Sequence, residues 1–116
     1  MDVCPPILDM EAISDLLANI EGPLFSELVG SFLTDSDGRL RRIEASLDPL
    51  DRIALKKEAH SMKGASATYG AMRFGWYCGI LESTAETAAH GELKNLVREM
   101  RSSLDETGPA LVSHYH

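Results

Sequence analysis

The sequence predicts an all-α fold, an antiparallel helical bundle with a four-helix bundle core and an additional N-terminal helix. Apolar residues recur every three or four positions along almost the whole chain, and the two-residue alternation of a half-buried strand is almost absent. Short segments with Gly or Pro separate the helical stretches, and such short connections place successive helices antiparallel. A chain of 116 residues has room for one ordinary domain.

The chain is expected to begin with a leader over residues 1–8. Asp9 is then a suitable N-cap for a first helix, because its carboxylate can accept hydrogen bonds from the first turn. The apolar face of this helix consists of Ile13, Leu16, Leu17 and Ile20. Gly22 ends the helix and Pro23 opens a second one, since proline fits a first helical turn.

The second helix carries the longest stripe of inward-facing positions. They are Phe25, Leu28, Val29, Phe32, Ser36, Leu40, Ile43 and Leu47. Gly30 and Gly38 each weaken this helix by up to about 1 kcal/mol relative to alanine, which leaves room for a bend. Asp48 and Pro49 interrupt the pattern and end the helix.

Three more stripes predict the remaining helices. The third, from about residue 50, contains Leu55, Ala59, Met62, Ser66 and Tyr69, the fourth Phe74, Cys78, Leu81, Ala85 and Ala88, and the fifth Leu93, Leu96, Val97, Met100 and Leu104. Gly70 acts as a C-cap for the third, and His90-Gly91 stops the fourth. The fifth ends before Gly108-Pro109. We therefore expect one domain over residues 9–108 and a tail over 109–116 that either frays or adds a turn.

Composition excludes several classes of protein. Eleven basic against eighteen acidic side chains leave a formal charge of −7, which disfavours binding to nucleic acid or to an anionic membrane surface. No apolar run approaches the length of about 20 residues that a membrane-spanning helix needs. The N-terminus lacks the regions of a signal peptide, and two distant cysteines make no disulfide framework. These features favour a cytoplasmic protein.

One helical stripe stands out chemically. His60 lies away from the apolar face of the third helix, and four neighbours fall within about 60° of it around the helix axis. These are Lys56, Lys63, Gly64 and Ala67. Lys57 and Arg73 can extend the basic margin. The pattern predicts an exposed imidazole on a flat, positive patch with room for close approach, on a chain that is acidic overall.

Each of these residues also has an ordinary structural interpretation. A single surface histidine is most often only a solvated side chain, and lysines at helical spacing usually face solvent. Gly64 could simply let another helix pack closely. The coincidence of all of them on one stripe carries more weight than any member does alone.

The same segment resembles a known family. The resemblance rests on His60-x-x-Lys63-Gly64, then Tyr69-Gly70-Ala71, then Cys78-x-x-Leu81-Glu82. In this pattern the chain is similar to the histidine-containing phosphotransfer (HPt) domain, most closely over about residues 50–86. Met62 and Tyr69 stand where leucines are commoner, and Gly75 and Gly79 are unusual in the fourth helix.

The resemblance implies a role for each matching residue. His60 is the expected phosphoacceptor, Lys63 contacts the phosphoryl group, and Gly64 gives the partner room. Glu82 occupies the position of a polar residue that bonds the other ring nitrogen. Gly79 shares a face of the fourth helix with Gly75 and Glu82; either close helix packing or partner approach can explain the two glycines.

The resemblance also implies partners. Members of the family carry a phosphoryl group between receiver-domain aspartates, here the receivers of a hybrid histidine kinase and of a response regulator. This chain is expected to bind no cofactor or metal, and Mg²⁺ belongs to the receiver. We expect a monomer. Lys56, Lys57, Gly64, Ala67 and Gly79 are the expected partner-binding residues.

The residue types suit such chemistry. An imidazole has an ordinary pKa of about 6.5, so a useful fraction is a neutral nucleophile at neutral pH. Nearby lysines favour the neutral ring, whereas a carboxylate at one ring nitrogen favours the charged ring and fixes the tautomer. The sequence alone leaves open which effect prevails.

Alternative functions have less support. A non-phosphorylated helical adaptor that binds receivers or other partners would need neither His60 nor Lys63. No phosphate-binding loop of the Gly-x-x-x-x-Gly-Lys type is present, so an autonomous kinase is not expected. The resemblance implies a phosphoryl carrier instead. Cys78 lies on an apolar stripe, where a buried hydrophobic role is more common than that of a nucleophile.

Overall fold

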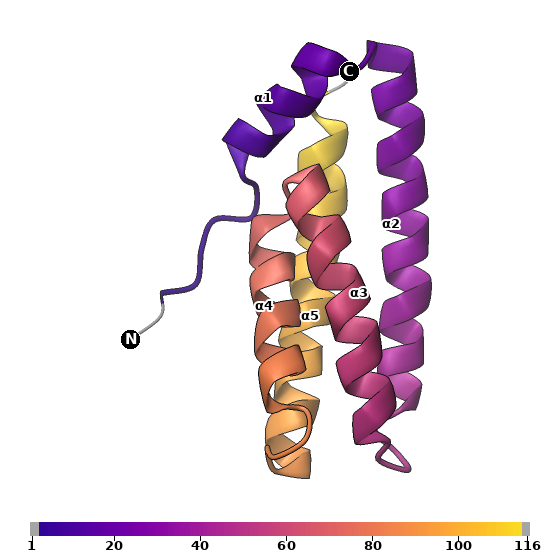
Figure 1. Cartoon of the computed structure of the whole chain (residues 1–116), viewed down its shortest axis with the longest axis vertical. Coiled ribbons are helices and arrows are strands. Elements are labelled where there is room, and N and C mark those ends of the chain that lie inside the picture. The colour runs from indigo at the N-terminus through magenta and orange to yellow at the C-terminus, as the bar shows by residue number, and fades with distance from the viewer. Residues whose placement is uncertain (1–2, 115–116) are drawn as a thin grey trace.

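Five helices make up the computed structural model, which describes residues 3–114 (Figure 1). They are α1 (Met10–Asn19), α2 (Gly22–Ala45), α3 (Arg52–Tyr69), α4 (Met72–Thr84) and α5 (His90–Val112). Helices α2 to α5 run alternately down and up, and α1 lies across the upper end of the bundle. The contacts of α3 with α4, α4 with α5, and α2 with both α3 and α5 close a four-helix core. The predicted all-α bundle with an extra N-terminal helix is confirmed.

A single apolar core fills the bundle, and it follows the predicted stripes except at Leu17 of α1, which was predicted to face inward and is 38% exposed. The large side chains that are almost completely buried are Phe25, Phe74, Ile13, Leu40, Ile43, Leu55, Met62, Leu81, Leu93, Met100, Leu111 and Val29. The ring of Tyr69 stacks on Phe32 with centroids 4.7 Å apart and joins α3 to α2. Ser36 is buried in register with its apolar neighbours, as expected.

The upper end of the bundle depends on Gly70. Its φ of +72° ends α3 in the left-handed region, which glycine adopts without steric cost. A Cβ at this position would lie 2.8 Å from Cγ1 of Ile13 and 2.9 Å from the carbonyl oxygen of Asp9. The amide of Asp9 donates to the Gly70 carbonyl at 2.8 Å, while the Asp9 side chain caps α1. Gly70 therefore seats α1 on the end of α3.

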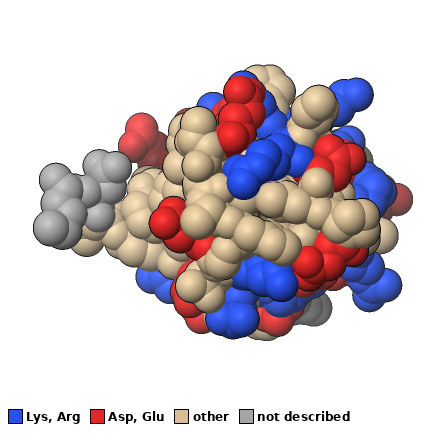
Figure 2. Space-filling view, turned by 90° about the horizontal axis from the view of Figure 1, so that it is seen from below, with Lys and Arg blue, Asp and Glu red and all other residues tan. Residues whose placement is uncertain are grey.

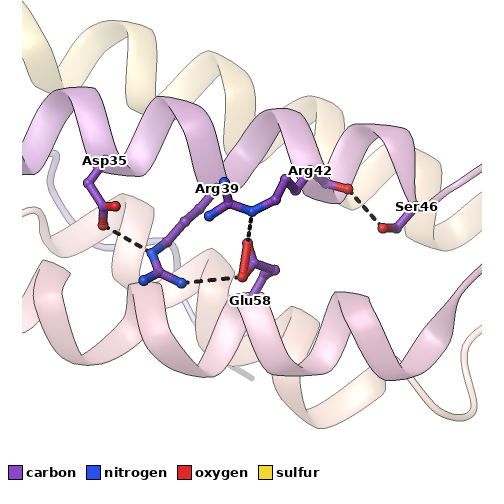
Figure 3. Close-up of polar contacts among 5 residues, drawn as sticks. All are labelled: Asp35, Arg39, Arg42, Ser46 and Glu58. Atoms are coloured by element: carbon purple, nitrogen blue, oxygen red, sulfur yellow. Dashed lines mark hydrogen bonds and ion pairs between the residues drawn. The ribbon is translucent and has the colours of Figure 1, made fainter.

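Charged side chains join α2 to α3 along the outside of the bundle (Figure 3). Arg39 and Arg42 of α2 both donate to the carboxylate of Glu58, at 3.2 and 2.8 Å, and Arg39 also pairs with Asp35. Because Glu58 and His60 are two residues apart on α3, their side chains point about 160° from one another. The network thus holds one side of α3 against α2 and leaves His60 on the opposite side.

Two predicted helix ends were wrong. Helix α4 ends at Thr84 rather than near Ala88, and His90 starts α5 instead of stopping α4. Arg52 of α3 donates to the carbonyls of Ala85 and Ala88 at 3.1 and 2.7 Å. These bonds satisfy acceptors that a longer helix would have used, and the turn still buries Ala85 completely.

The expected end of the fifth helix was also wrong. Helix α5 passes through Pro109 and ends at Val112, so the first four residues of the predicted tail over 109–116 are helical. Leu111 is completely buried, and the buried hydroxyl of Thr107 donates to the Ser103 carbonyl at 2.7 Å. Burial of the last turn thus outweighs the hydrogen bond that proline removes.

The leader contacts α4 near its start. Nε of Arg73 donates a hydrogen bond to the Pro5 carbonyl at 2.9 Å, and the backbone amide of Arg73 donates to the Ile7 carbonyl at 3.4 Å. The first two leader residues and the last two tail residues lie outside the described part of the chain.

Charges of both signs intermingle at the lower end of the bundle, so the net negative charge does not form a single acidic field there (Figure 2). Within residues 3–114, no helix combines the length and the apolar character needed to cross a membrane.

Candidate functional site

His60 stands on the outer side of α3, with 72% of its side chain exposed. Its neighbours Ala59 and Met62 are buried in the core, at 0% and 1% exposure, which fixes the rotation of the helix about its axis. The predicted separation of the histidine from the apolar face is therefore observed. Its exposure leaves the ring open to an approaching protein.

Glu82 of α4 connects two residues of α3. Its Oε2 contacts Nδ1 of His60, and its Oε1 lies 2.6 Å from the ammonium nitrogen of Lys63. The Glu82 side chain is only 19% exposed, so it approaches the imidazole from the groove between the two helices. The structure thus brings together three of the predicted site residues.

This contact sets the tautomer of the neutral ring. Hydrogen bonds from Lys63 and then His60 hold the pKa of the Glu82 carboxyl below its usual range, so Glu82 is ionised at neutral pH. A carboxylate only accepts hydrogen bonds, which requires the proton of a neutral ring to be on Nδ1. Nε2 then carries the lone pair, and it has no hydrogen-bond partner among the described residues.

The three lysines of the basic margin differ in their partners. Lys63 pairs with Glu82 of α4, and Lys56 pairs with Glu86, which lies in the turn just after α4. That pairing raises the pKa of Lys56 and lowers the pKa of Glu86. Lys57 is exposed and has no ion pair within the described residues. It leaves one uncompensated positive charge beside the imidazole.

The small residues near the site have different neighbours. Gly64 and Ala67 are exposed, and a Cβ on Gly64 would meet no atom within 4 Å. Close packing inside this chain therefore does not require glycine at Gly64. A Cβ on Gly75 would lie 3.0 Å from Cβ of Ser66, so Gly75 allows α3 and α4 to approach closely. On Gly79, a Cβ would meet Cδ of Lys63 at 3.5 Å.

One apolar and one acidic side chain that were not predicted lie beside His60, and one predicted residue does not lie there. Ile53 and Glu86 line the same surface hollow as His60. Helical spacing could have found both, because Ile53 lies two turns before His60 and Glu86 one turn after Glu82. Arg73 does not extend the basic margin, since its side chain bonds the Pro5 carbonyl and pairs with Glu106 of α5 at 3.5 Å.

Other candidate chemistry is not supported by the geometry. Burial is the main cause that raises the pKa of the Cys78 thiol to about 12, so this side chain is a poor nucleophile at neutral pH. Over residues 3–114, no group of three or more His, Cys, Asp or Glu side chains is arranged to hold a metal ion.

Comparison with known proteins identifies the family. The model of the Hpt domain matches residues 27–108, which include every candidate site residue described above. The chain therefore belongs to the Hpt domain family and is a histidine phosphotransfer protein of a phosphorelay. No curated protein matches it.

A solved structure is similar over nearly the whole chain. It is the crystal structure of histidine-containing phosphotransfer protein B (HptB) from Pseudomonas aeruginosa PAO1, with a TM-score of 0.86 and 29% sequence identity. The alignment covers 95% of each chain, so it also includes regions beyond the 27–108 match.

Proposed function

We propose that His60 is the residue that carries the phosphoryl group. The observation that carries this proposal is the contact between Nδ1 of His60 and Glu82, because it leaves the lone pair of Nε2 on the exposed side of the ring. A nucleophile needs an available lone pair and an open approach, and this nitrogen has both.

The transfer step follows from this arrangement. Nε2 attacks the phosphorus of a receiver aspartyl phosphate, a nitrogen–phosphorus bond forms, and the phosphorus–oxygen bond breaks so that the aspartate leaves as a carboxylate. The phosphorylated ring keeps its proton on Nδ1 and is positively charged, and the ionised Glu82 balances this charge. Attack on the same phosphorus by a second receiver aspartate reverses the step.

The residues around the ring support the step in different ways. Phosphoryl transfer depends mainly on positioning and charge neutralisation, and Lys63 provides a positive charge next to the ring. Lys56, Lys57, Gly64 and Ala67 form the surrounding surface that meets the receiver. Mg²⁺ is supplied with the acceptor aspartate by the receiver rather than by this chain.

The proposal includes the kind of partners. The donor is the receiver of a hybrid histidine kinase, and the acceptor is the receiver of a response regulator. The protein acts in the cytoplasm, which agrees with two free cysteines in the described part of the chain, and it acts as a monomer. Cell fractionation and the molar mass in solution test these two points.

Transfer from a phosphorylated receiver tests the proposal directly. We expect wild type to become labelled, with a product that is labile in acid and stable in alkali, and to pass the label to a second receiver. His60→Gln should remain unlabelled. His114→Gln is the matched control, because His114 lies near the C-terminal end of the sequence, beyond α5, and this variant should be labelled as wild type is.

Two results would contradict the proposal. Equal labelling of His60→Gln and wild type would place the phosphoryl group elsewhere. Binding without labelling across the organism's full set of receivers would favour an adaptor that carries no phosphoryl group.

A further inference from the structure

The side chain of Lys63 crosses from α3 to α4 before it reaches Glu82. Its Cδ lies where a Cβ on Gly79 would be 3.5 Å away, and its Nζ lies 2.6 Å from Oε1 of Glu82. Gly79 is three residues before Glu82, so the two share one side of α4. The methylene chain of Lys63 thus lies over Gly79 while its ammonium group reaches the carboxylate.

Gly79 differs from the other glycines in helices near it. A Cβ on Gly79 would have only Lys63 Cδ within 4 Å, outside its own helical turn. By the same measure Gly64 faces open space and Gly75 faces Ser66. Among the described residues, a single neighbour therefore borders the space that a side chain at position 79 would occupy, and that neighbour is a residue of the proposed site.

We propose that Gly79 is a positioning residue for phosphotransfer, whose small size lets Lys63 lie across α4 and move between Glu82 and the phosphoryl group on His60. This inference rests on the proposed role of His60. It differs from the expectation that Gly79 contacts the partner, because it assigns Gly79 to a neighbour within the same chain.

The movement follows from the charges on either side of Lys63. Before transfer, Glu82 is the anion that the ammonium group contacts. After transfer, His60 carries a phosphoryl group with up to about two negative charges. The positively charged ring then attracts the Glu82 carboxylate and competes with Lys63 for it. Lys63 then has a second anion within reach of a flexible four-carbon side chain. The methylene chain of Lys63 can change its conformation only if no large side chain projects from α4 beneath it, and glycine at position 79 meets this condition.

The size of the added side chain determines the expected effect. A contact of 3.5 Å is ordinary van der Waals packing, so alanine at position 79 fits under the Lys63 stem. Valine adds two methyl groups on Cβ at the same place, and they displace the stem. Gly79→Val should therefore slow transfer as loss of the Lys63 charge does, while Gly79→Ala should not have an effect of that size.

The experiment measures labelling of His60 by phosphoramidate, a small donor that needs no docking surface, and by a phosphorylated receiver. Gly79→Val should slow both reactions about tenfold, as loss of a charge-assisted hydrogen bond would. Lys63→Ala should slow them by a similar factor, and the double variant should be no slower than either single one. Gly79→Ala should slow both reactions less than Gly79→Val does, because a single Cβ only touches the Lys63 stem.

A second readout separates positioning from general damage. Because the Lys63 hydrogen bond is the largest cause that lowers the pKa of Glu82, Gly79→Val should raise the pKa of that carboxyl, followed by carbon-13 NMR. Gly30→Val is the matched control, since a Cβ there meets nothing within 4 Å and α2 lies away from α4. If Gly79→Val is not folded by circular dichroism, Gly79→Leu tests the same prediction.

Several results would overturn the inference. Slower transfer from the receiver with normal phosphoramidate labelling would make Gly79 a partner contact. Multiplication of the two single effects in the double variant would show that Gly79 acts independently of Lys63. If Gly79→Val changes neither the labelling rate nor the pKa of Glu82, then Gly79 has no role in positioning Lys63. Failure of wild type to be labelled on His60 by either donor would instead overturn the proposed function itself.

Discussion

Glu82 of α4 contacts Nδ1 of His60, a residue of α3 that lies 22 positions earlier in the chain. The histidine is mostly exposed and the glutamate mostly buried, at 72% and 19% exposure of their side chains. A fixed carboxylate therefore orients an otherwise mobile ring. The proton on Nδ1 and the lone pair on Nε2 both follow from this one contact.

Replacement of Glu82 should change the tautomer of His60. In wild type we expect the neutral ring to be protonated at Nδ1, as seen from its nitrogen-15 chemical shifts. In Glu82→Ala the ring should become a mixture of tautomers, and transfer from a receiver should slow about tenfold, since a charge-assisted hydrogen bond is lost. Glu86→Gln is the control for the tautomer, because Glu86 pairs with Lys56 instead. An unchanged tautomer in Glu82→Ala would contradict the orienting role.

The same carboxylate should make stability depend on pH. Folding lowers the pKa of Glu82, so its ionised form stabilises the folded state above the unfolded value of about 4.3. That contribution is lost as the pH falls through the lower folded-state value. We expect the difference in free energy of unfolding between wild type and Glu82→Gln to be largest above about pH 5 and to shrink as the pH falls towards about 3.

Urea unfolding at a series of pH values measures this difference. The control is Glu82→Gln in a Lys63→Ala background, where the main cause of the lowered pKa is absent and the pH dependence should be smaller. A difference between wild type and Glu82→Gln that stays constant from pH 3 to 7 would be inconsistent with the ion pair.

Substitution of Gly64 should separate stability from transfer. A side chain there meets open space in the middle of an exposed helical turn, so Gly64→Gln should stabilise the fold by up to about 1 kcal/mol. It should also slow transfer from a receiver, because the added side chain occupies the approach to His60. Labelling by phosphoramidate should stay at the wild-type rate.

Thermal unfolding and the two donors together test this prediction. Gly30→Gln is the matched control, because it adds the same side chain at another open position of a helix and should leave both reactions unchanged. Normal transfer from every receiver in Gly64→Gln would show that partners do not need the space above Gly64.

Gly70 should tolerate no side chain. The residue has a φ of +72°, and a Cβ would lie within 3.0 Å of both Ile13 and Asp9, so Gly70→Ala combines backbone strain with a clash. We expect a loss of about 2 kcal/mol or more in the free energy of unfolding. Gly91→Ala is the control, since its Cβ would meet nothing within 4 Å. Equal stability of the two variants in urea would contradict the account of how α1 is seated.

Much of the fold could be predicted from the sequence, because helical periodicity is a local property. The stripes of α2 to α5 matched buried or partly buried positions, whereas the stripe of α1 included the exposed Leu17. Asp9, Pro23 and Gly70 marked helix ends through the chemistry of their own backbone and side chains. The ends of α4 and α5 could not be predicted in this way. Capping by Arg52 and burial of Leu111 are contacts between segments far apart in the chain.

In the candidate site, too, contacts within one helix could be predicted from the sequence, whereas contacts between helices could not. His60, Lys63 and Gly64 share one face of a single helix, so their spacing alone placed them together. The sequence by itself thus determined the fold class and the family pattern. Only the tertiary structure decided that Glu82 holds both His60 and Lys63, and that the Lys63 stem lies over Gly79. Those contacts join two helices, and the packing of α3 against α4 sets their distance and rotation.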